Sequence, residues 1–184
     1  MLESILSKTI LMNKTILITG GAIRIGKAIC EKFHKEGFNI LCHYNSSKKY
    51  AEELSEQLNS IRKNSCSIIQ FDLNDIDKYA IFIKKVKQLS KSIDVLVNNA
   101  SAFYSSPLAN YEEGDWEDLH NSNLRGPFLI SSLLRENIKS TNGCIINITD
   151  AMVLRGMKDY SIYSTAKGGL ETLTRSLARD LAPD

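Results

Sequence analysis

The feature that most constrains the fold is a regular alternation along the chain, in which short apolar runs are followed by segments whose apolar residues have helical spacing. This alternation predicts a parallel β-sheet with helices on both faces, and strands covered on both faces are hydrophobic along their whole length. We expect strands at residues 14–19, 38–43, 66–71, 93–98 and 143–149. We expect helices at residues 24–36, 47–62, 75–90, 115–140 and 160–181.

These elements predict an α/β fold, with a short leader at 1–13 and a single domain at 14–184. A chain of 184 residues, 43% of them hydrophobic, is long enough to bury one core. Right-handed crossovers give a Rossmann-like doubly wound sheet of order 3-2-1-4-5, with ligands bound beyond the carboxyl ends of the strands. Charged residues interrupt the first 14 residues, so their apolar runs are too short for a signal peptide or a membrane span.

Charge and cysteine content argue against several classes of partner. The formal net charge is +2, and no long block of like charges indicates binding to nucleic acid or to an acidic membrane. The four cysteines include no CxxC pair, and with three histidines they show no metal-ligand spacing. We therefore predict a cytoplasmic protein with reduced thiols, no metal, and neither nucleic acid nor membrane as a partner.

A glycine-rich turn follows the first predicted strand and opens the first predicted helix. It reads TGGAIRIG at 19–26, with glycines at 20, 21 and 26. Glycines allow the backbone to approach a ligand closely, and a helix N-terminus offers free N–H groups to a pyrophosphate. The turn predicts dinucleotide binding, and a tight turn without a ligand is the alternative.

The end of the second predicted strand bears on which dinucleotide is bound. NAD-selective sites usually carry an acidic residue there, which binds the ribose 2′-hydroxyl. Here the chain reads His43-Tyr44-Asn45-Ser46-Ser47-Lys48, which offers hydroxyls and a cation to a 2′-phosphate, and Arg24 can approach from the first loop. NADPH is therefore favoured. The alternative is that Lys48 and Lys49 only begin a solvated helix.

Tyr163 and Lys167 are four residues apart, so both side chains project from one face of a predicted helix. An ammonium group beside a phenol stabilises the phenolate, and we expect it to lower the tyrosine pKa from its usual value of about 10. Tyr163 would then donate a proton near neutral pH. The spacing is common by chance, and a core tyrosine beside a surface lysine is the alternative.

Three further features accompany this pair. Asn98-Asn99-Ala100 ends the fourth predicted strand, Asn123 lies on the long helix, and Asp150 lies thirteen residues before Tyr163. Together with TGxxxxxG, they resemble the short-chain dehydrogenase/reductase family from about residue 14 onward. The resemblance implies that Tyr163 is the general acid, that Lys167 orients the nicotinamide ribose, and that Asn123 holds a relay water. Pro127 lacks an N–H and would leave the Asn123 carbonyl free for that water.

Asp150 stands where carbonyl-reducing members of the family carry a serine. That serine donates a hydrogen bond to the developing oxyanion, which an ionised aspartate would repel. A carboxylate suits a substrate with ring nitrogens and an amino group. The segments TGxxxRxG, HYNSS, NNASxFY, TDAM and YSIYSTAK resemble the pteridine reductase branch, which reduces dihydropterin or dihydrofolate with NADPH.

The branch resemblance also implies individual roles. Asp150 and Tyr163 would deliver the proton, and Phe103 would stack the pterin against the nicotinamide. Ser101 would contact the ring or a cofactor phosphate, and Arg24 would serve both phosphate and substrate. Asp72 would meet the adenine, with a helix cap as its alternative. The complete set of implied cofactor contacts is Gly20, Arg24, Ile25, Gly26, His43, Tyr44, Asn45, Ser46, Ser47, Asp72, Leu73, Asn99, Ala100, Ser101, Tyr163 and Lys167.

Two departures from the branch pattern are visible. Ser46 stands where an arginine is usual, and the chain ends at Asp184, where family members continue with a sixth strand, a substrate-covering segment, a helix and a seventh strand. We therefore expect a C-terminally truncated form.

Two other functions stay open. One is a carbonyl reductase, for example of 3-ketoacyl thioesters, with Thr149 supplying the hydroxyl. Neighbouring side chains on a strand face opposite ways, which disfavours Thr149. The other is a non-catalytic dinucleotide-binding or dimerising module, because helices corresponding to 115–140 and 160–181 pair subunits in the family. These helices also predict a homo-oligomer, either a dimer or a tetramer.

Overall fold

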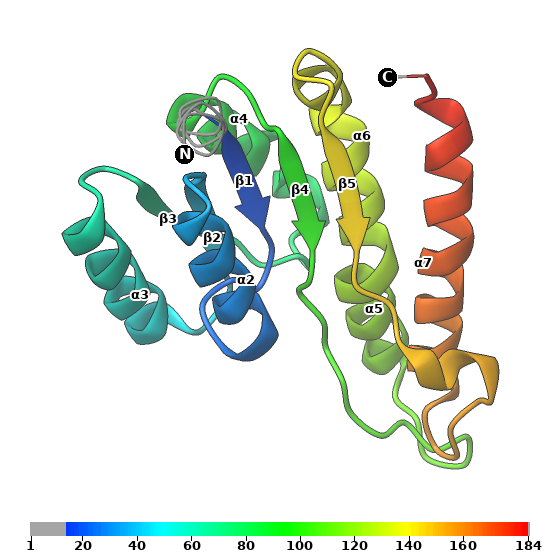
Figure 1. Ribbon diagram of the computed structural model, residues 1–184. Helices are drawn as coiled ribbons and strands as arrows, with labels where there is room; N and C mark the ends of the chain where they lie inside the picture. The colour runs from blue at the N-terminus through cyan, green and yellow to red at the C-terminus, as the bar shows by residue number, and fades with distance from the viewer. Residues whose placement is uncertain (1–13, 184) are drawn as a thin grey trace.

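The computed structural model describes residues 14–183, and these contain a five-stranded parallel sheet of order β3-β2-β1-β4-β5 (Figure 1). The sheet confirms the predicted Rossmann-like architecture, while the predicted leader at 1–13 lies outside the described residues. Every strand begins and ends within two residues of its predicted position: β1 Thr15–Ile18, β2 Asn39–Tyr44, β3 Cys66–Gln70, β4 Val95–Asn98 and β5 Cys144–Asn147.

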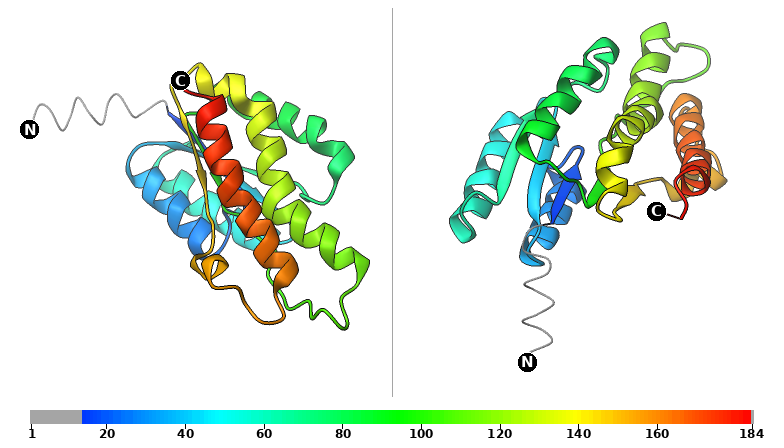
Figure 2. Two further views of the ribbon diagram at one scale, coloured as in Figure 1. Left: turned by 90° about the vertical axis from the view of Figure 1, so that its right-hand side faces the viewer. Right: turned by 90° about the horizontal axis from the view of Figure 1, so that it is seen from above.

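Helices cover both faces of the sheet, as Figures 1 and 2 show. On one face, α2 and α3 pack on side chains such as Ile16 and Ile40; on the other, α4 and α6 pack on Leu17 and Leu96. The longest helix, α7, lies alongside α5 and beyond the edge strand β5. The helices are α2 Arg24–Lys35, α3 Lys48–Ile61, α4 Tyr79–Leu89, α5 Glu113–His120, α6 Gly126–Lys139 and α7 Ser161–Asp180.

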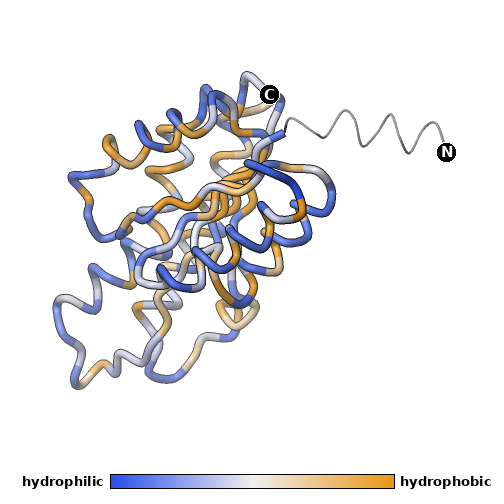
Figure 3. The backbone as a smooth tube through the Cα atoms, turned by 90° about the vertical axis from the view of Figure 1, so that its left-hand side faces the viewer, coloured by the Kyte–Doolittle hydropathy of each residue, from blue (hydrophilic) through white to orange (hydrophobic). Residues whose placement is uncertain are grey.

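The hydropathy of the chain follows this layering. The strands form the apolar centre of the described part of the chain, and hydrophilic residues occupy the outer turns of the helices (Figure 3). Alternate residues of β1 face opposite helical layers and are all buried, which is why this strand is apolar throughout. None of the helices described is both long enough and apolar enough to cross a membrane.

The long helix predicted at 115–140 is interrupted. A π-helical turn, Asn121–Arg125, separates α5 from α6, and the Gly126 N–H bonds to the carbonyl of Asn121, five residues earlier. Pro127 therefore lies in the first turn of α6, a position where a missing N–H is tolerated. Such π-helical turns are frequent at functional sites.

Candidate active site

A pocket of about 470 Å³ opens at the carboxyl ends of the central strands. Of the predicted cofactor contacts, all but Tyr163 and Lys167 line it, and they come from the start of α2, the end of β2 and the loops that follow β1, β2, β3 and β4. The topology accounts for this grouping, since the strand order reverses between β1 and β4 and leaves a crevice there. These lining residues are Gly20, Arg24, Ile25, Gly26, His43, Tyr44, Asn45, Ser46, Ser47, Asp72, Leu73, Asn99, Ala100 and Ser101.

The loop after β1 has the close backbone approach that a dinucleotide phosphate requires. Gly20 has a φ of +63°, and a Cβ atom there would lie 2.9 Å from the Ala100 Cα. A Cβ atom on Gly26 would lie 2.0 Å from the Gly20 carbonyl oxygen. Arg24 also has a positive φ, +50°, a conformation that favours glycine. Both glycines therefore lie too close to neighbouring backbone to carry a side chain, and this tight turn, the glycine cradle, fits the close backbone approach to a dinucleotide.

Thr19 and Asn99 tie this loop to the end of β4. Thr19 Oγ1 accepts hydrogen bonds from the N–H groups of Asn99 and Ala100, at 2.9 and 3.0 Å. Asn99 Nδ2 donates to the carbonyls of Thr19 and Gly20, each at 3.0 Å. The two walls of the pocket are therefore held together by short polar contacts. Sequence reasoning did not single out Thr19.

His43 also belongs to the structural frame of the loop. Its side chain is buried, and its two ring nitrogens bond to Gly20 N at 3.1 Å and to the Phe71 carbonyl at 2.9 Å. Burial lowers the His43 pKa to about 4, despite the opposing bond to Phe71 and the charge of Asp72. The ring is therefore neutral at physiological pH.

The loop after β2 brings hydroxyl groups to the pocket, but not the lysine predicted to accompany them. Ser46 and Ser47 line the pocket just before α3, whereas Lys48 is not among the lining residues. Its ammonium lies 3.7 Å from Glu52 Oε1, one helical turn along α3, and both side chains are exposed. Among the described lining residues, Arg24 is the one permanent cation.

Asp150 and Tyr163 form a direct pair. The Tyr163 hydroxyl donates to Asp150 Oδ2 at 2.8 Å. The other carboxylate oxygen accepts from the Met152 N–H at 2.8 Å, so that Asp150 caps the 3₁₀ turn Ala151–Leu154. Both oxygens are engaged, and the carboxylate is held towards the tyrosine.

The environment raises the pKa of Tyr163 instead of lowering it, contrary to the sequence-based expectation. Burial is the main cause, followed by the hydrogen bond to Asp150 and by its charge, while Ser101 acts weakly in the opposite direction. Lys167 is also buried, and its ammonium donates to the Ile148 carbonyl at 2.9 Å. Burial lowers the Lys167 pKa to about 8, against the opposing charge of Asp150.

Phe103 links the pocket to the Asp150–Tyr163 pair. It lines the pocket and remains 57% exposed. Its ring stacks on Tyr160, with centroids 4.8 Å apart, and meets Tyr163 edge-on at 4.9 Å. An exposed aromatic ring in contact with Tyr163 is well placed to receive a flat heterocycle.

Asn123 is fully buried within the π-helical turn. Its amide donates to the carbonyls of Ala102 and Leu119, both at 2.9 Å, and its oxygen accepts from Ser101 Oγ at 2.6 Å. The side chain thus fixes the loop after β4 at Ser101. The role of the Asn123 carbonyl in holding a water stays a prediction.

Several lining residues were missed by sequence reasoning. Asp118 and Ser122 reach the pocket from the α5 side, and Asn74 Nδ2 bridges to Asp118 Oδ1 at 2.6 Å. Their four-residue spacing places Asp118 and Ser122 on one helical face, but no motif marks that face as part of a site. The complete missed set is Ala22, Ile23, Asn74, Ala102, Asp118 and Ser122.

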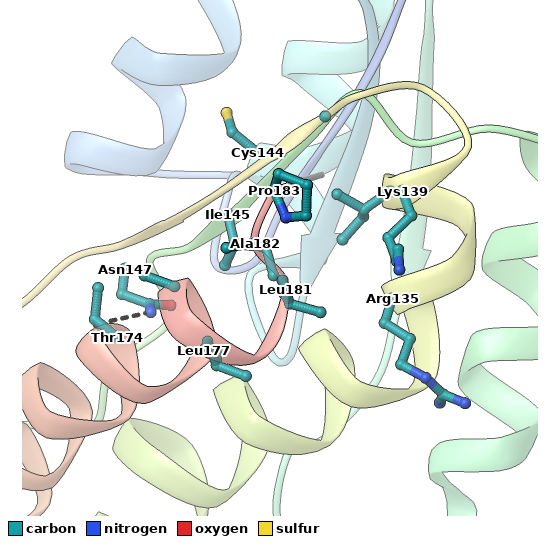
Figure 4. A pocket seen from close by; sticks show the side chains of 13 residues that line it. Arg135, Lys139, Cys144, Ile145, Asn147, Thr174, Leu177, Leu181, Ala182 and Pro183 are labelled. Carbon is teal, nitrogen blue, oxygen red and sulfur yellow. Dashed lines mark hydrogen bonds between the residues drawn. The ribbon is translucent and has the colours of Figure 1, made fainter.

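A second cavity of about 350 Å³ lies between β5, the end of α6 and the C-terminal half of α7 (Figure 4). Asn147 Nδ2 donates to Thr174 Oγ1 at 2.9 Å within it. It contains none of the predicted site residues, so the candidate site is the pocket at the strand ends. Within residues 14–183, no group of three or more His, Cys, Asp or Glu side chains is arranged to hold a metal ion.

The sequence of this chain is similar to those of known proteins. The family model described as short chain dehydrogenase matches residues 14–184. The 3-oxoacyl-acyl-carrier-protein reductase FabG of Staphylococcus aureus is 33% identical over 172 residues, covering 93% of this chain and 70% of the relative. Pteridine reductase 1 of Leishmania tarentolae is 30% identical over 204 residues, covering 90% of this chain and 71% of the relative.

Proposed function

The chain belongs to the short-chain dehydrogenase family and is an oxidoreductase, and we propose that it reduces a dihydropterin or dihydrofolate with NADPH. The observation that carries this proposal is the 2.8 Å hydrogen bond between Tyr163 and Asp150. A carboxylate, in place of a second hydroxyl, thus lies beside the proposed proton donor.

The chemistry of the substrate explains why a carboxylate is suitable there. Reduction of a carbonyl places negative charge on oxygen, which hydrogen-bond donors stabilise and a nearby carboxylate opposes. Reduction of a C=N bond requires a proton at nitrogen instead. The amino and ring N–H groups of a pterin can donate to Asp150, and such charge-assisted hydrogen bonds are stronger than neutral ones.

The proposed roles follow from the contacts in the site. Bound NADPH supplies the hydride, and the loop around Gly20 and Gly26 holds its phosphates. Tyr163 keeps its proton at neutral pH because its pKa is raised, so its hydroxyl serves as the proton donor. Asp150 orients that hydroxyl, and Lys167, one helical turn away, stabilises the phenolate that proton transfer leaves. Phe103 offers its exposed ring to the pterin.

Preference for NADPH rests on the loop after β2. No acidic residue occupies the end of that strand, and Ser46 and Ser47 line the pocket instead. Hydroxyl groups and the Arg24 guanidinium favour a 2′-phosphate over a bare ribose hydroxyl.

A carbonyl reductase acting on 3-ketoacyl thioesters is the second candidate, because FabG is at least as similar to this chain as the pteridine reductase. In that function, Thr149 would have to supply the hydroxyl. Thr149 is exposed, whereas its neighbour Asp150 holds Tyr163. The homo-oligomer and the non-catalytic module stay predictions.

The decisive experiment compares the wild type with Asp150→Ser, following NADPH oxidation with a dihydropterin, dihydrofolate and an acetoacetyl thioester. We expect pterin or folate turnover by the wild type, and a kcat/KM about 100-fold lower in the variant, the typical value of one positioned acid–base group. NADPH affinity should change by less than about threefold, since Asp150 is not among the residues that line the pocket.

Thr149→Ala is the matched control, because it removes the hydroxyl required by the second candidate and leaves the carboxylate in place. It should retain pterin turnover. Wild-type turnover of the thioester alone, or an Asp150→Ser variant as active on pterin as the wild type, would refute the proposal.

A further inference from the structure

His43 connects three consecutive strand ends beneath the dinucleotide pocket. It is the penultimate residue of β2, its ring accepts from the Gly20 N–H in the loop after β1, and its other ring nitrogen bonds to the Phe71 carbonyl beyond β3. Its own carbonyl accepts from the Gly21 N–H at 2.8 Å. Two successive amides of the glycine loop are therefore held by this one residue.

The partners determine the tautomer of the ring. A backbone N–H can only donate, so Nδ1 must carry a lone pair towards Gly20; a carbonyl can only accept, so Nε2 must carry the proton towards Phe71. Both ring positions are satisfied only by the neutral Nε2–H form. The low pKa of the buried ring is consistent with that form.

These bonds also join two parts of the pocket. Gly20 lies in the glycine cradle, which lines the pocket, and Phe71 is followed directly by Asp72 and Leu73, which line the pocket as well. A change at the His43 ring would therefore alter both of these parts of the pocket.

We propose that His43 is a positioning residue, whose Nδ1 atom holds the Gly20 amide so that the glycine loop is already in its binding conformation before a dinucleotide arrives. Pre-organisation of this kind increases affinity because less conformational freedom is lost on binding. The ring also packs edge-on against Phe82 at 5.5 Å, so filling space in the core is the competing explanation.

Two substitutions separate these explanations, because each keeps one of the two hydrogen bonds. In His43→Asn, the side-chain oxygen can take the place of Nδ1 and accept from Gly20, while the donor to Phe71 is lost. In His43→Gln, the terminal amide can take the place of Nε2 and donate to Phe71, while the acceptor for Gly20 is lost. Both replace an aromatic ring by a smaller amide and should lose similar packing.

The experiment measures the dissociation constant for NADPH, and for NADH as a second probe, by titration of the full chain. We expect His43→Gln to weaken binding about tenfold or more, the usual effect of leaving one buried group without a partner. We expect the dissociation constant of His43→Asn to stay within about threefold of the wild-type value, because this variant keeps an acceptor for the Gly20 N–H. The thermal midpoints of the two variants should be similar.

Equal loss of affinity in both variants, or a loss in neither, would overturn the proposal in favour of simple packing. Should either variant fail to fold, ¹⁵N chemical shifts of the wild-type ring supply an independent test: a neutral Nε2–H tautomer is expected, and an Nδ1–H tautomer would overturn the proposal. These readouts do not involve pterin, so they can fail or succeed separately from the proposed reaction.

Discussion

At Tyr163, two effects of the environment act in the same direction. Burial disfavours the phenolate, and the Asp150 carboxylate both accepts a hydrogen bond from the phenol and repels negative charge on the phenolate. The phenol therefore holds its proton at neutral pH, as the proposed role of Tyr163 as proton donor requires.

Lys167 gives a testable pH dependence. Its pKa is lowered to about 8. The Lys167 amine therefore carries its proton below about pH 7 and loses that proton as the pH rises through 8. Because kcat/KM reports groups of the free enzyme, kcat/KM for NADPH should fall above about pH 8, approaching tenfold per pH unit.

The matched control is Lys48→Met, since Lys48 is paired with Glu52 outside the pocket and its loss should leave the profile unchanged. A wild-type profile that stays flat to about pH 9.5, near the usual lysine pKa of about 10.4, would contradict the assigned role.

At the scale of elements, the turn between β1 and α2 depends on backbone proximity. The two glycines lie so close to neighbouring backbone that side chains are excluded, and Thr19 and Asn99 hold the turn against β4. The π-helical turn plays a similar part on the opposite wall, where it buries Asn123 against the loop that carries Ser101. Irregular segments thus shape the pocket, and the regular elements hold them in place.

Gly26→Ala tests the glycine turn. Its new Cβ atom would lie 2.0 Å from the Gly20 oxygen, so the backbone must move. We expect NADPH affinity to fall at least about tenfold and the free energy of unfolding to drop by about 1–3 kcal/mol, as for other overpacked sites. Titration and urea denaturation measure the two effects.

Gly114→Ala is the control, because a Cβ atom there meets nothing within 4 Å. This exposed position in α5 should tolerate alanine with unchanged NADPH affinity and a stability gain of up to about 1 kcal/mol from helix propensity. If both variants bind NADPH as well as the wild type, the cradle is not needed for binding.

At the scale of the whole molecule, buried neutral histidines link stability to pH. The folded-state pKa of His43 is about 4, below the unfolded value of about 6.5, and burial also lowers the pKa of His34. Between these two pH values the unfolded chain binds more protons, so acidification favours unfolding. The free energy of unfolding should fall by up to about 3 kcal/mol from His43 alone as pH drops from 6.5 to 4.

Urea denaturation at several pH values measures this effect. His43→Asn removes the titrating group, so the difference between wild type and variant isolates its contribution from that of the carboxylates. The difference in the free energy of unfolding between wild type and His43→Asn should change steadily between pH 6.5 and 4. A difference that is independent of pH would show that His43 does not titrate as its burial implies.

The sequence by itself determined the fold, and it predicted the edge of the sheet at which the candidate site lies. The alternation of apolar runs and helical segments is a local pattern, and it predicts the parallel order 3-2-1-4-5. Because the strand ends meet at one edge of such a sheet, residues as distant as Gly20 and Ser101 were expected in one pocket, where the structure places them. The pairing of Asp150 with Tyr163 was implied by the resemblance to the pteridine reductase branch, and the structure joins the two side chains by a hydrogen bond.

Only the tertiary structure decided the properties that depend on burial and on contacts between distant segments. It raised the pKa of Tyr163 where the spacing to Lys167 predicted a lower one. It also brought Asp118 to Asn74, 44 residues earlier in the chain. No local pattern encodes such effects, since solvent exposure and through-space charge exist only once the chain has packed.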